Sequence, residues 1–381
     1  MMKYAFLVAK NLMRSKRRTL LTISSIAVSI FVFAALSSVP AVARQILGDT
    51  ASSLRIACHN KAGLAYPIPE AYRSKIVATP HVVAVVAESW FGGIYHDVND
   101  QFPNLAVDPE QVQAMWPDWG ISDEAYSQFT KIRTAALVGP ETMKRFRLHV
   151  GQQVTLRGTY YPFNVTLNIV GVMGGKSPPN FLLFRRDYLS EAAHDQGTVD
   201  NMWVRVDQSS SVPEVIASLD EQFANSPAET QSESEGAFLG NFMNNYKIFF
   251  QIAQGLGLIV IFTIGLVAAN TAAMSIRERR AEIVVMRAIG FTSRTILALL
   301  LAESMLIALL GGIIGCGTAY ALFKIFSFNA NVLGPFGTLA LPTSVAIEAL
   351  GAAAMIGFLS AFVPARSAAQ RNIVEGLRAV V

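Results

Sequence analysis

Residues 275–294 read Ser-Ile-Arg-Glu-Arg-Arg-Ala-Glu-Ile-Val-Val-Met-Arg-Ala-Ile-Gly-Phe-Thr-Ser-Arg, and they separate two long apolar runs. The run before them covers residues 246–274, and the run after them covers residues 295–326. A helix needs about 20 apolar residues to cross the hydrocarbon core of a membrane. The sequence therefore predicts two transmembrane helices that are joined by a short charged loop.

The charged loop has the composition of a helix up to Gly290, a residue type that ends helices as a C-terminal cap. Ile283, Met286 and Ile289 recur at three-residue spacing, so one face of this helix is apolar while charged residues fill the other faces. Such a face suits docking to another protein. A helix that lies on the membrane and turns its arginines to anionic lipid has the same composition, so both interpretations stay open at this point.

The whole chain has the composition of a membrane protein. Its 381 residues are 52% hydrophobic and 15% charged, whereas soluble domains carry about 25% charged residues. The formal net charge is +4, but Lys and Arg gather beside the apolar runs. The basic balance therefore indicates membrane topology and not nucleic-acid binding.

Two more apolar runs complete the predicted membrane part. Residues 19–40 form the first, and they follow residues 1–18, which hold Lys and Arg but no acid and predict a cytoplasmic amphipathic helix. A secretory signal peptide also begins with a basic region, but its apolar core is shorter than this one. The fourth predicted helix covers residues 343–364, after a short outer loop at residues 327–342.

Basic residues flank membrane spans on the cytoplasmic side. The basic N-terminus, the loop at residues 275–294 and the tail at residues 365–381 are therefore predicted to be cytoplasmic. It follows that residues 41–245 form an extracytoplasmic domain. We expect a multi-pass membrane protein with both termini in the cytoplasm.

The predicted extracytoplasmic domain has the mixed pattern of an α+β fold. Helical patterns occur at residues 69–78, 141–146 and 212–223. β-Branched or alternating runs occur at residues 82–86, 134–138, 154–156, 165–172 and 202–206. Residues 225–236 are rich in Ser and Glu with little to bury, so we expect a surface connection there.

Local signatures of catalysis are missing from the sequence. There is no Gly-x-x-x-x-Gly-Lys-Ser/Thr phosphate loop, no His-Glu-x-x-His, no Cys-x-x-Cys and no Gly-x-Ser-x-Gly. We expect no enzyme activity, no metal and no cofactor bound by this chain. Cys58 and Cys316 fall in the outer domain and in a span, so we expect no disulfide between them, and we expect Cys58 to be a plain buried thiol.

Two features of the third predicted helix concern its packing. Glu303 lies about 12 Å along it, where an unpaired carboxylate is costly, so we expect this side chain to face protein and to have a partner or be protonated. Gly311, Gly312 and Gly315 give the helix a small-residue face on which another helix can pack closely.

The charged loop and its surroundings resemble the MacB/FtsX-like permeases of ABC transporters. The residues that carry the resemblance are Glu278, Arg279, Arg280, Ala281, Glu282, Ile283, Met286, Arg287, Ala288, Ile289, Gly290, Ile296, Leu297, Glu303, Ser304, Gly311 and Gly312. The outer domain and the tail resemble the family more loosely, and the tail has Ile373 where the family often has proline.

The resemblance implies an α-helical membrane protein, with four transmembrane helices and a large extracytoplasmic α+β domain between helices 1 and 2. It implies a permease of the bacterial inner membrane that works as a dimer, with itself or with a paralogue. Because the chain contains no phosphate loop, we expect a stand-alone permease that binds a separate ATPase subunit. The loop residues implied to contact the ATPase are Arg277, Glu278, Arg279, Arg280, Glu282, Ile283, Met286, Arg287 and Gly290. Glu303, Gly311, Gly312 and Gly315 are implied to serve helix packing and transmission of movement. ATP and Mg would be bound by the partner ATPase.

Two functions of different classes follow from the resemblance. In the first, ATP-driven movement of the outer domain exports or extracts a substrate, with a periplasmic adaptor as a further partner. In the second, the same movement regulates an extracytoplasmic cell-wall hydrolase, as in FtsX-type signalling. The spans contain few polar residues, which fits transmission of movement better than conduction through a pore.

Overall fold

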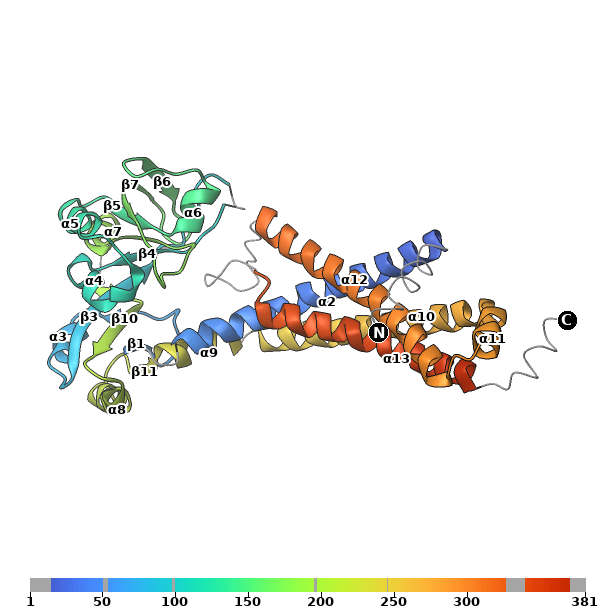
Figure 1. The fold of residues 1–381 in the computed structure, drawn as a ribbon. Helices are drawn as coiled ribbons and strands as arrows, with labels where there is room; N and C mark the ends of the chain where they lie inside the picture. The colour runs from blue at the N-terminus through green and yellow to red at the C-terminus, as the bar shows by residue number, and fades with distance from the viewer. Residues whose placement is uncertain are drawn as a thin grey trace. The chain divides into compact units, whose positions relative to one another are not determined.

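The computed structural model describes residues 15–50, 54–97, 100–194, 197–244, 246–326 and 340–370. The chain forms two compact units. The helical unit contains residues 15–42, 246–326 and 340–370, and the outer unit is Ala43–Asn245 (Figure 1). The predictions for residues 1–14, 327–339 and 371–381 lie outside the described residues.

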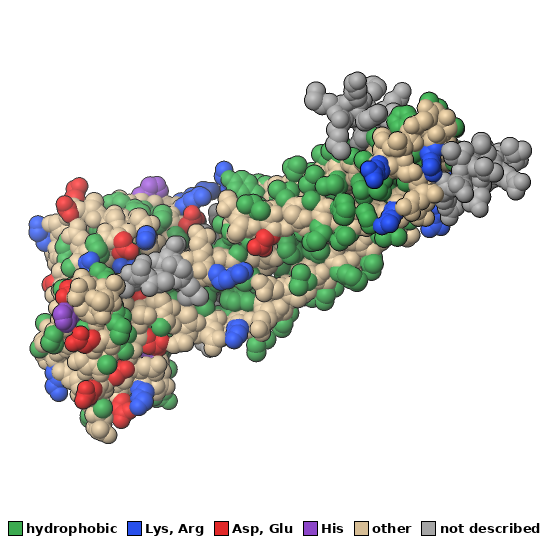
Figure 2. All heavy atoms as spheres, turned by 60° about the horizontal axis from the view of Figure 1, so that its bottom comes forward, with side chains coloured by type: hydrophobic (Ala, Val, Ile, Leu, Met, Phe, Trp, Pro, Cys, Tyr) green, Lys and Arg blue, Asp and Glu red, His purple; other side chains and the backbone are tan. Residues whose placement is uncertain are grey.

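Four helices in the described residues are long and apolar enough to cross a membrane. They are α2 (Lys16–Thr50), α10 (Lys247–Glu278), α12 (Ser293–Phe326) and α13 (Thr343–Gln370). Hydrophobic side chains cover much of the visible surface of these helices (Figure 2). The four predicted transmembrane helices are confirmed.

Several helices run past their predicted ends. α2 continues through Pro40 to Thr50, and α13 continues through Pro364 to Gln370, although we expected both spans to end at these prolines. A proline removes one backbone hydrogen bond, and a helix can continue past it where the rest of its length is held by packing. α10 likewise extends into the charged segment and ends at Glu278.

Glycines bring the membrane helices close together. A Cβ atom on Gly311 would lie 2.8 Å from the Ile26 side chain of α2, and one on Gly315 would lie 2.5 Å from the Ala27 carbonyl oxygen. A Cβ atom on Gly312 would lie 2.8 Å from Ala353 of α13. These distances are shorter than a side chain allows, so α2 packs closely on α12 at Gly311 and Gly315, and α13 packs closely on it at Gly312.

The outer unit is built on one mixed sheet of nine strands. In the order of the sheet, the strands are β11 (Thr230–Ser234), β1 (Arg55–Asn60), β10 (Asn201–Val206), β3 (Val82–Trp90), β4 (Asn104–Val107), β8 (Leu182–Arg185), β5 (Ala135–Val138), β7 (Asn164–Val172) and β6 (Gln153–Arg157). The β4–β8 and β5–β7 pairs are parallel, and the other neighbours are antiparallel. A separate short pair joins β2 (Ile68–Pro69) to β9 (Thr198–Val199).

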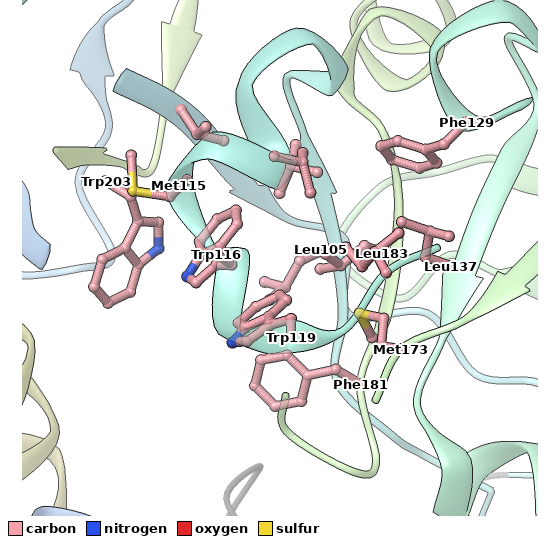
Figure 3. Packing of buried hydrophobic residues seen from close by; sticks show 14 of the residues in the cluster. Leu105, Met115, Trp116, Trp119, Phe129, Leu137, Met173, Phe181, Leu183 and Trp203 are labelled. Atoms are coloured by element: carbon pink, nitrogen blue, oxygen red, sulfur yellow. The ribbon is translucent and has the colours of Figure 1, made fainter. Parts of the chain in front are cut away.

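Alternation along the strands buries apolar side chains on both faces of this sheet. On β3, Ala84 and Val86 face one core while Val85 and Ala87 face another. The first core contains the stacked rings of Trp116 and Trp119, with ring centroids 4.5 Å apart, and Trp203 beside them (Figure 3). The helices α4 (Val112–Met115) and α5 (Asp123–Lys131) contribute to this core.

The opposite face of the sheet holds two further cores. Near β1, β3 and β10 it is covered by α3 (Tyr72–Val77) and α8 (Val212–Gln222). Near β5, β6 and β7 it is covered by α6 (Pro140–Arg145) and α7 (Arg186–Ala193). Short 3₁₀ helices lie at Pro109–Gln111, Pro117–Trp119 and Ser209–Ser211. The α+β fold predicted for the outer domain is confirmed.

The predicted surface connection at residues 225–236 is wrong. β11 lies within it and pairs with β1 at the edge of the sheet, and α9 (Glu235–Asn244) begins directly afterwards. An edge strand pairs on one side only and leaves part of its length to solvent, so it can be polar in sequence. We also predicted no element at β1, β4, β8, α5 and α7.

Candidate coupling site

The charged segment folds into one short helix, α11 (Arg280–Ala288), between α10 and α12. Arg279 breaks the helical path with ψ at 17°. At the other end Gly290 has a φ of +103°, which a glycine adopts without strain. The N–H of Gly290 donates to the Arg287 carbonyl at 3.0 Å, and that of Phe291 donates to the Met286 carbonyl at 3.1 Å. This pair of bonds is a Schellman cap, so the predicted helix stop at Gly290 is confirmed.

Two of the three residues of the predicted docking ridge, Ile283 and Met286, face inward, and only Ile289 is exposed. Ile283 is only 4% exposed and packs with Ile276 of α10 and Ile296 of α12. Ala365 and Ala369 of α13 complete this cluster, and Met286 is partly buried against it. Ile283 therefore holds α11 to this chain's own helices, and the expectation that it forms an exposed ridge is corrected.

A second row of α11 faces outward. Val285 is 54% exposed and Ile289 is 72% exposed, and the small side chains of Ala281 and Ala288 are exposed beside them. These four positions, which we call the outer row, follow the helical spacing of three and four residues. The adjacent Val284-Val285 pair was the signal in the sequence, because a helix with apolar residues at neighbouring positions is apolar on more than one face.

Arg279 links α11 to the interior of α12. Its Nη1 lies 2.8 Å from a carboxylate oxygen of Glu303, and the two side chains are each 15% exposed. Its Nε lies 3.2 Å from a carboxylate oxygen of Glu282 on α11. The predicted partner of Glu303 is thus found, and it comes from the charged segment itself.

Two more arginines tie this region to the remaining helices. Arg18 of α2 pairs with Glu278 at the end of α10 and donates to the Ser275 hydroxyl at 2.9 Å. Arg287 of α11 donates to the Ala369 carbonyl of α13 at 3.1 Å. Arg277 and Arg280 have exposed side chains. Of the sequence-predicted site residues, Glu278, Arg279, Glu282 and Arg287 therefore serve contacts within the chain.

A small cavity of about 60 Å³ lies among the four membrane helices next to these ion pairs, and its wall is partly polar and partly apolar. Arg18, Arg279 and Glu303 line it. Hydroxyl groups also line it, from Ser15, Thr19, Thr22, Thr271, Ser275, Ser304 and Ser360. The cavity has room and polar partners for water.

Two stretches of the chain match known protein families. Residues 19–222 match the MacB-like periplasmic core domain, and residues 255–373 match the FtsX-like permease C-terminal region. The first match alone takes in more than half of the chain. The chain belongs to the MacB/FtsX-like permease family. The second match includes α11 and the segment that connects it to α12. Membership of this family implies an ATPase partner and a location in the inner membrane.

Relatives of this MacB/FtsX-like permease carry the names of ABC transporter components. An uncharacterized ABC transporter permease of Methanocaldococcus jannaschii is 22% identical over 399 residues, which cover 97% of this chain and 96% of the relative. The macrolide export ATP-binding/permease protein MacB of Campylobacter fetus subsp. fetus is 32% identical over 126 residues, which cover 33% of this chain and 19% of the relative. MacB of Bdellovibrio bacteriovorus is 25% identical over 308 residues, covering 74% of this chain and 44% of the relative. The alignments thus span less than half the length of these MacB proteins.

Two solved structures similar to parts of the permease are extracytoplasmic regions. The periplasmic region of MacB from Actinobacillus actinomycetemcomitans aligns with a TM-score of 0.38 at 10% identity, covering 51% of this chain and 94% of that chain. The extracellular domain of the noncanonic ABC-type transporter YknZ from Gram-positive bacteria aligns with a TM-score of 0.36 at 11% identity, covering 47% of this chain and 99% of that chain.

Reactive groups are not clustered in the part of the permease that the structure describes. Among the residues that the structure describes, no group of three His, Cys, Asp or Glu side chains could hold a metal ion. Cys58 and Cys316 are both free and buried. Burial raises the pKa of the Cys58 thiol to about 11, so the reactive thiolate is disfavoured at neutral pH, as expected of a plain buried thiol.

Proposed function

We propose that this chain is the permease subunit of an ABC transporter that couples ATP hydrolysis by a separate ATPase subunit to movement of its outer unit. This movement drives export or extraction of a substrate. Two permease chains and two ATPase subunits form one assembly in contact with membrane lipid, and a periplasmic adaptor joins it for export. The ATPase holds ATP and Mg, and α11 and both termini lie in the cytoplasm.

The outer row of α11 carries the proposal. Val285 and Ile289 are exposed apolar side chains at the end of the membrane helices, and the exposed Arg277 and Arg280 precede them in the chain. An apolar row on a short helix beside exposed cations suits a groove on a protein partner, where apolar anchors give affinity and charges give orientation.

The inner face of α11 explains how docking would move the membrane helices. Ile283 packs against α10 and α12, and Arg287 holds the end of α13. A closely packed interior transmits strain because it has no room to absorb it. Displacement of α11 by the ATPase is therefore passed to three membrane helices, and α2 follows through the contact of Arg18 with Glu278.

The outer row can be tested by introducing a charge. Val285→Asp or Ile289→Asp would desolvate a carboxylate in the docked state, so we expect the amount of bound ATPase to fall about tenfold or more. The tagged chain is purified from its native membrane, and the co-purifying ATPase subunit is identified and quantified by mass spectrometry. Insertion is checked by the yield of membrane-bound chain.

A matched control is available in the outer unit. Val77 of α3 is 52% exposed, close to the 54% of Val285, and Val77→Asp should leave ATPase binding unchanged. Full ATPase binding by Val285→Asp and Ile289→Asp, or a wild-type chain that brings no ATPase with it, would contradict the proposal.

A further inference from the structure

We propose that Arg279 and Glu303 are a positioning pair whose charges carry movement of α11 into α12. The charged and hydroxyl groups that line the adjoining cavity let this pair rearrange without leaving an uncompensated charge. The inference rests on the proposed function and deepens it. It names the contact that passes the ATPase-driven displacement of α11 to the membrane helices.

The position of Arg279 suits this task. It stands at the break between α10 and α11, where the backbone leaves the helical path. Its guanidinium holds Glu282 on α11 and Glu303 on α12 at the same time. One side chain therefore joins the coupling helix to a membrane helix, in addition to the apolar contacts of Ile283.

The surroundings provide alternative partners. Arg18 lines the same cavity as Arg279 and Glu303 and is itself paired with Glu278. Breaking a buried ion pair is costly when one charge is left without a partner. Here water has room in the cavity, and the hydroxyls of Thr22, Thr271 and Ser304 line it. When α11 shifts, these charged side chains can therefore exchange partners, and none of them is left buried without a partner or water.

The apolar part of the cavity wall, which includes Ile26, Ala308 and Gly357, is closely packed. A Cβ atom on Gly357 of α13 would lie 2.8 Å from the Cβ of Ala308, and one on Gly311 would lie 2.8 Å from Ile26. Separating such apolar contacts opens a dry void, which is costly, whereas separating polar walls admits water. The glycine contacts on this wall therefore resist separation, and the charged wall next to α11 is the part that we expect to rearrange.

The test uses the full complex with its co-purifying ATPase in lipid nanodiscs. Three forms are compared with wild type: Glu303→Gln, Arg279→Lys, and the swap Arg279→Glu with Glu303→Arg. Glu348→Gln is the matched control, because Glu348 is an exposed carboxylate on α13 outside the cavity lining. Two quantities are measured: the bound ATPase with its hydrolysis rate, and the ATP-dependent change in hydrogen exchange of the outer unit.

We expect Glu303→Gln to keep bound ATPase and ATP hydrolysis while the ATP-dependent exchange response of the outer unit falls about tenfold. Arg279→Lys should retain much of that response because it keeps opposite charges at the two positions. The swap should regain part of it, since the carboxylate then placed at position 279 pairs with position 303 but repels Glu282. Glu348→Gln should behave as wild type. A role in packing alone would not restore the response on exchange of the charges.

A full exchange response in Glu303→Gln would overturn the inference while leaving the proposed function intact. Loss of bound ATPase in Glu303→Gln would also overturn it, because the pair would then serve docking. Equal loss in Glu303→Gln, Arg279→Lys and the swap would assign the effect to shape instead of charge. A wild-type complex without ATPase would overturn the proposed function itself, and this inference with it.

Discussion

The two units of the molecule each bury an arginine–carboxylate contact, and the two contacts are built differently. In the outer unit, Asp108 lies 2.7 Å from Arg186 and 2.6 Å from Arg73, and it also accepts from the Ala87 N–H at 3.3 Å. In the helical unit, Glu303 is held by Arg279 beside a cavity. A carboxylate with a full set of donors fixes the elements around it, whereas one with a single cation and room for water can change partners.

The largest effect should follow from breaking the outer contact. Asp108→Ala leaves Arg186 buried with Glu70 as its remaining carboxylate, and we expect the free energy of unfolding to fall by about 3–5 kcal/mol. Chemical denaturation can be followed by tryptophan fluorescence, because all four tryptophans lie in the outer unit. A fall in the free energy of unfolding below about 1 kcal/mol, as is typical of surface pairs, would show that the contact does not hold the outer unit together.

Glu88 extends the comparison to a carboxylate whose hydrogen-bond donors are neutral side chains instead of arginines. Asn201 Nδ2 and Trp203 Nε1 lie 3.1 and 3.2 Å from its carboxylate. Burial raises the pKa of Glu88 from 4.5 to about 7, and the charge of Asp200 adds to the rise, although these hydrogen bonds oppose it. An acid whose pKa is raised on folding stabilises the fold below its unfolded pKa, and this stability is lost as pH rises to the folded pKa.

We therefore expect the wild-type outer unit to lose about 3 kcal/mol of stability between pH 4.5 and pH 7 through this group. Glu88→Gln should remove most of that loss, and Glu124→Gln, at an exposed position on α5, should leave it in place. The measurement is the unfolding midpoint by tryptophan fluorescence across this pH range. An identical pH profile for Glu88→Gln and wild type would rule out Glu88 as the source.

The smallest stability change should come from Glu303. In Glu303→Gln the amide oxygen can still accept from Arg279, and Arg279 keeps Glu282, so we expect a loss of about 1 kcal/mol. SDS-induced unfolding of the helical unit, followed by circular dichroism, measures it. A loss as large as that of Asp108→Ala would make the two contacts alike and would count against a mobile pair.

The same contrast shows what the sequence could predict. The four spans, the stop at Gly290 and the need of Glu303 for a partner follow from rules of length, backbone conformation and charge burial, which act locally. The inward turn of Ile283 does not, because α11 is apolar on two faces and only the packing of α10, α12 and α13 selects one of them.

The partner of Glu303 was also out of reach of the sequence. Several arginines precede it in the charged segment, and the break at Arg279 decides which of them turns toward α12. β11 was missed for a related reason, since the polar residues of an edge strand become a strand only through pairing with β1.

Site-directed labelling of the outer row tests the central claim most directly. With Cys58 and Cys316 replaced by alanine, an Ile289→Cys chain carries a single thiol at a position that is 72% exposed. We predict no reaction with a membrane-impermeant maleimide added to intact cells, full reaction in inverted vesicles stripped of ATPase, and protection when the ATPase is restored. Labelling from outside intact cells, or no protection by the ATPase, would contradict the account.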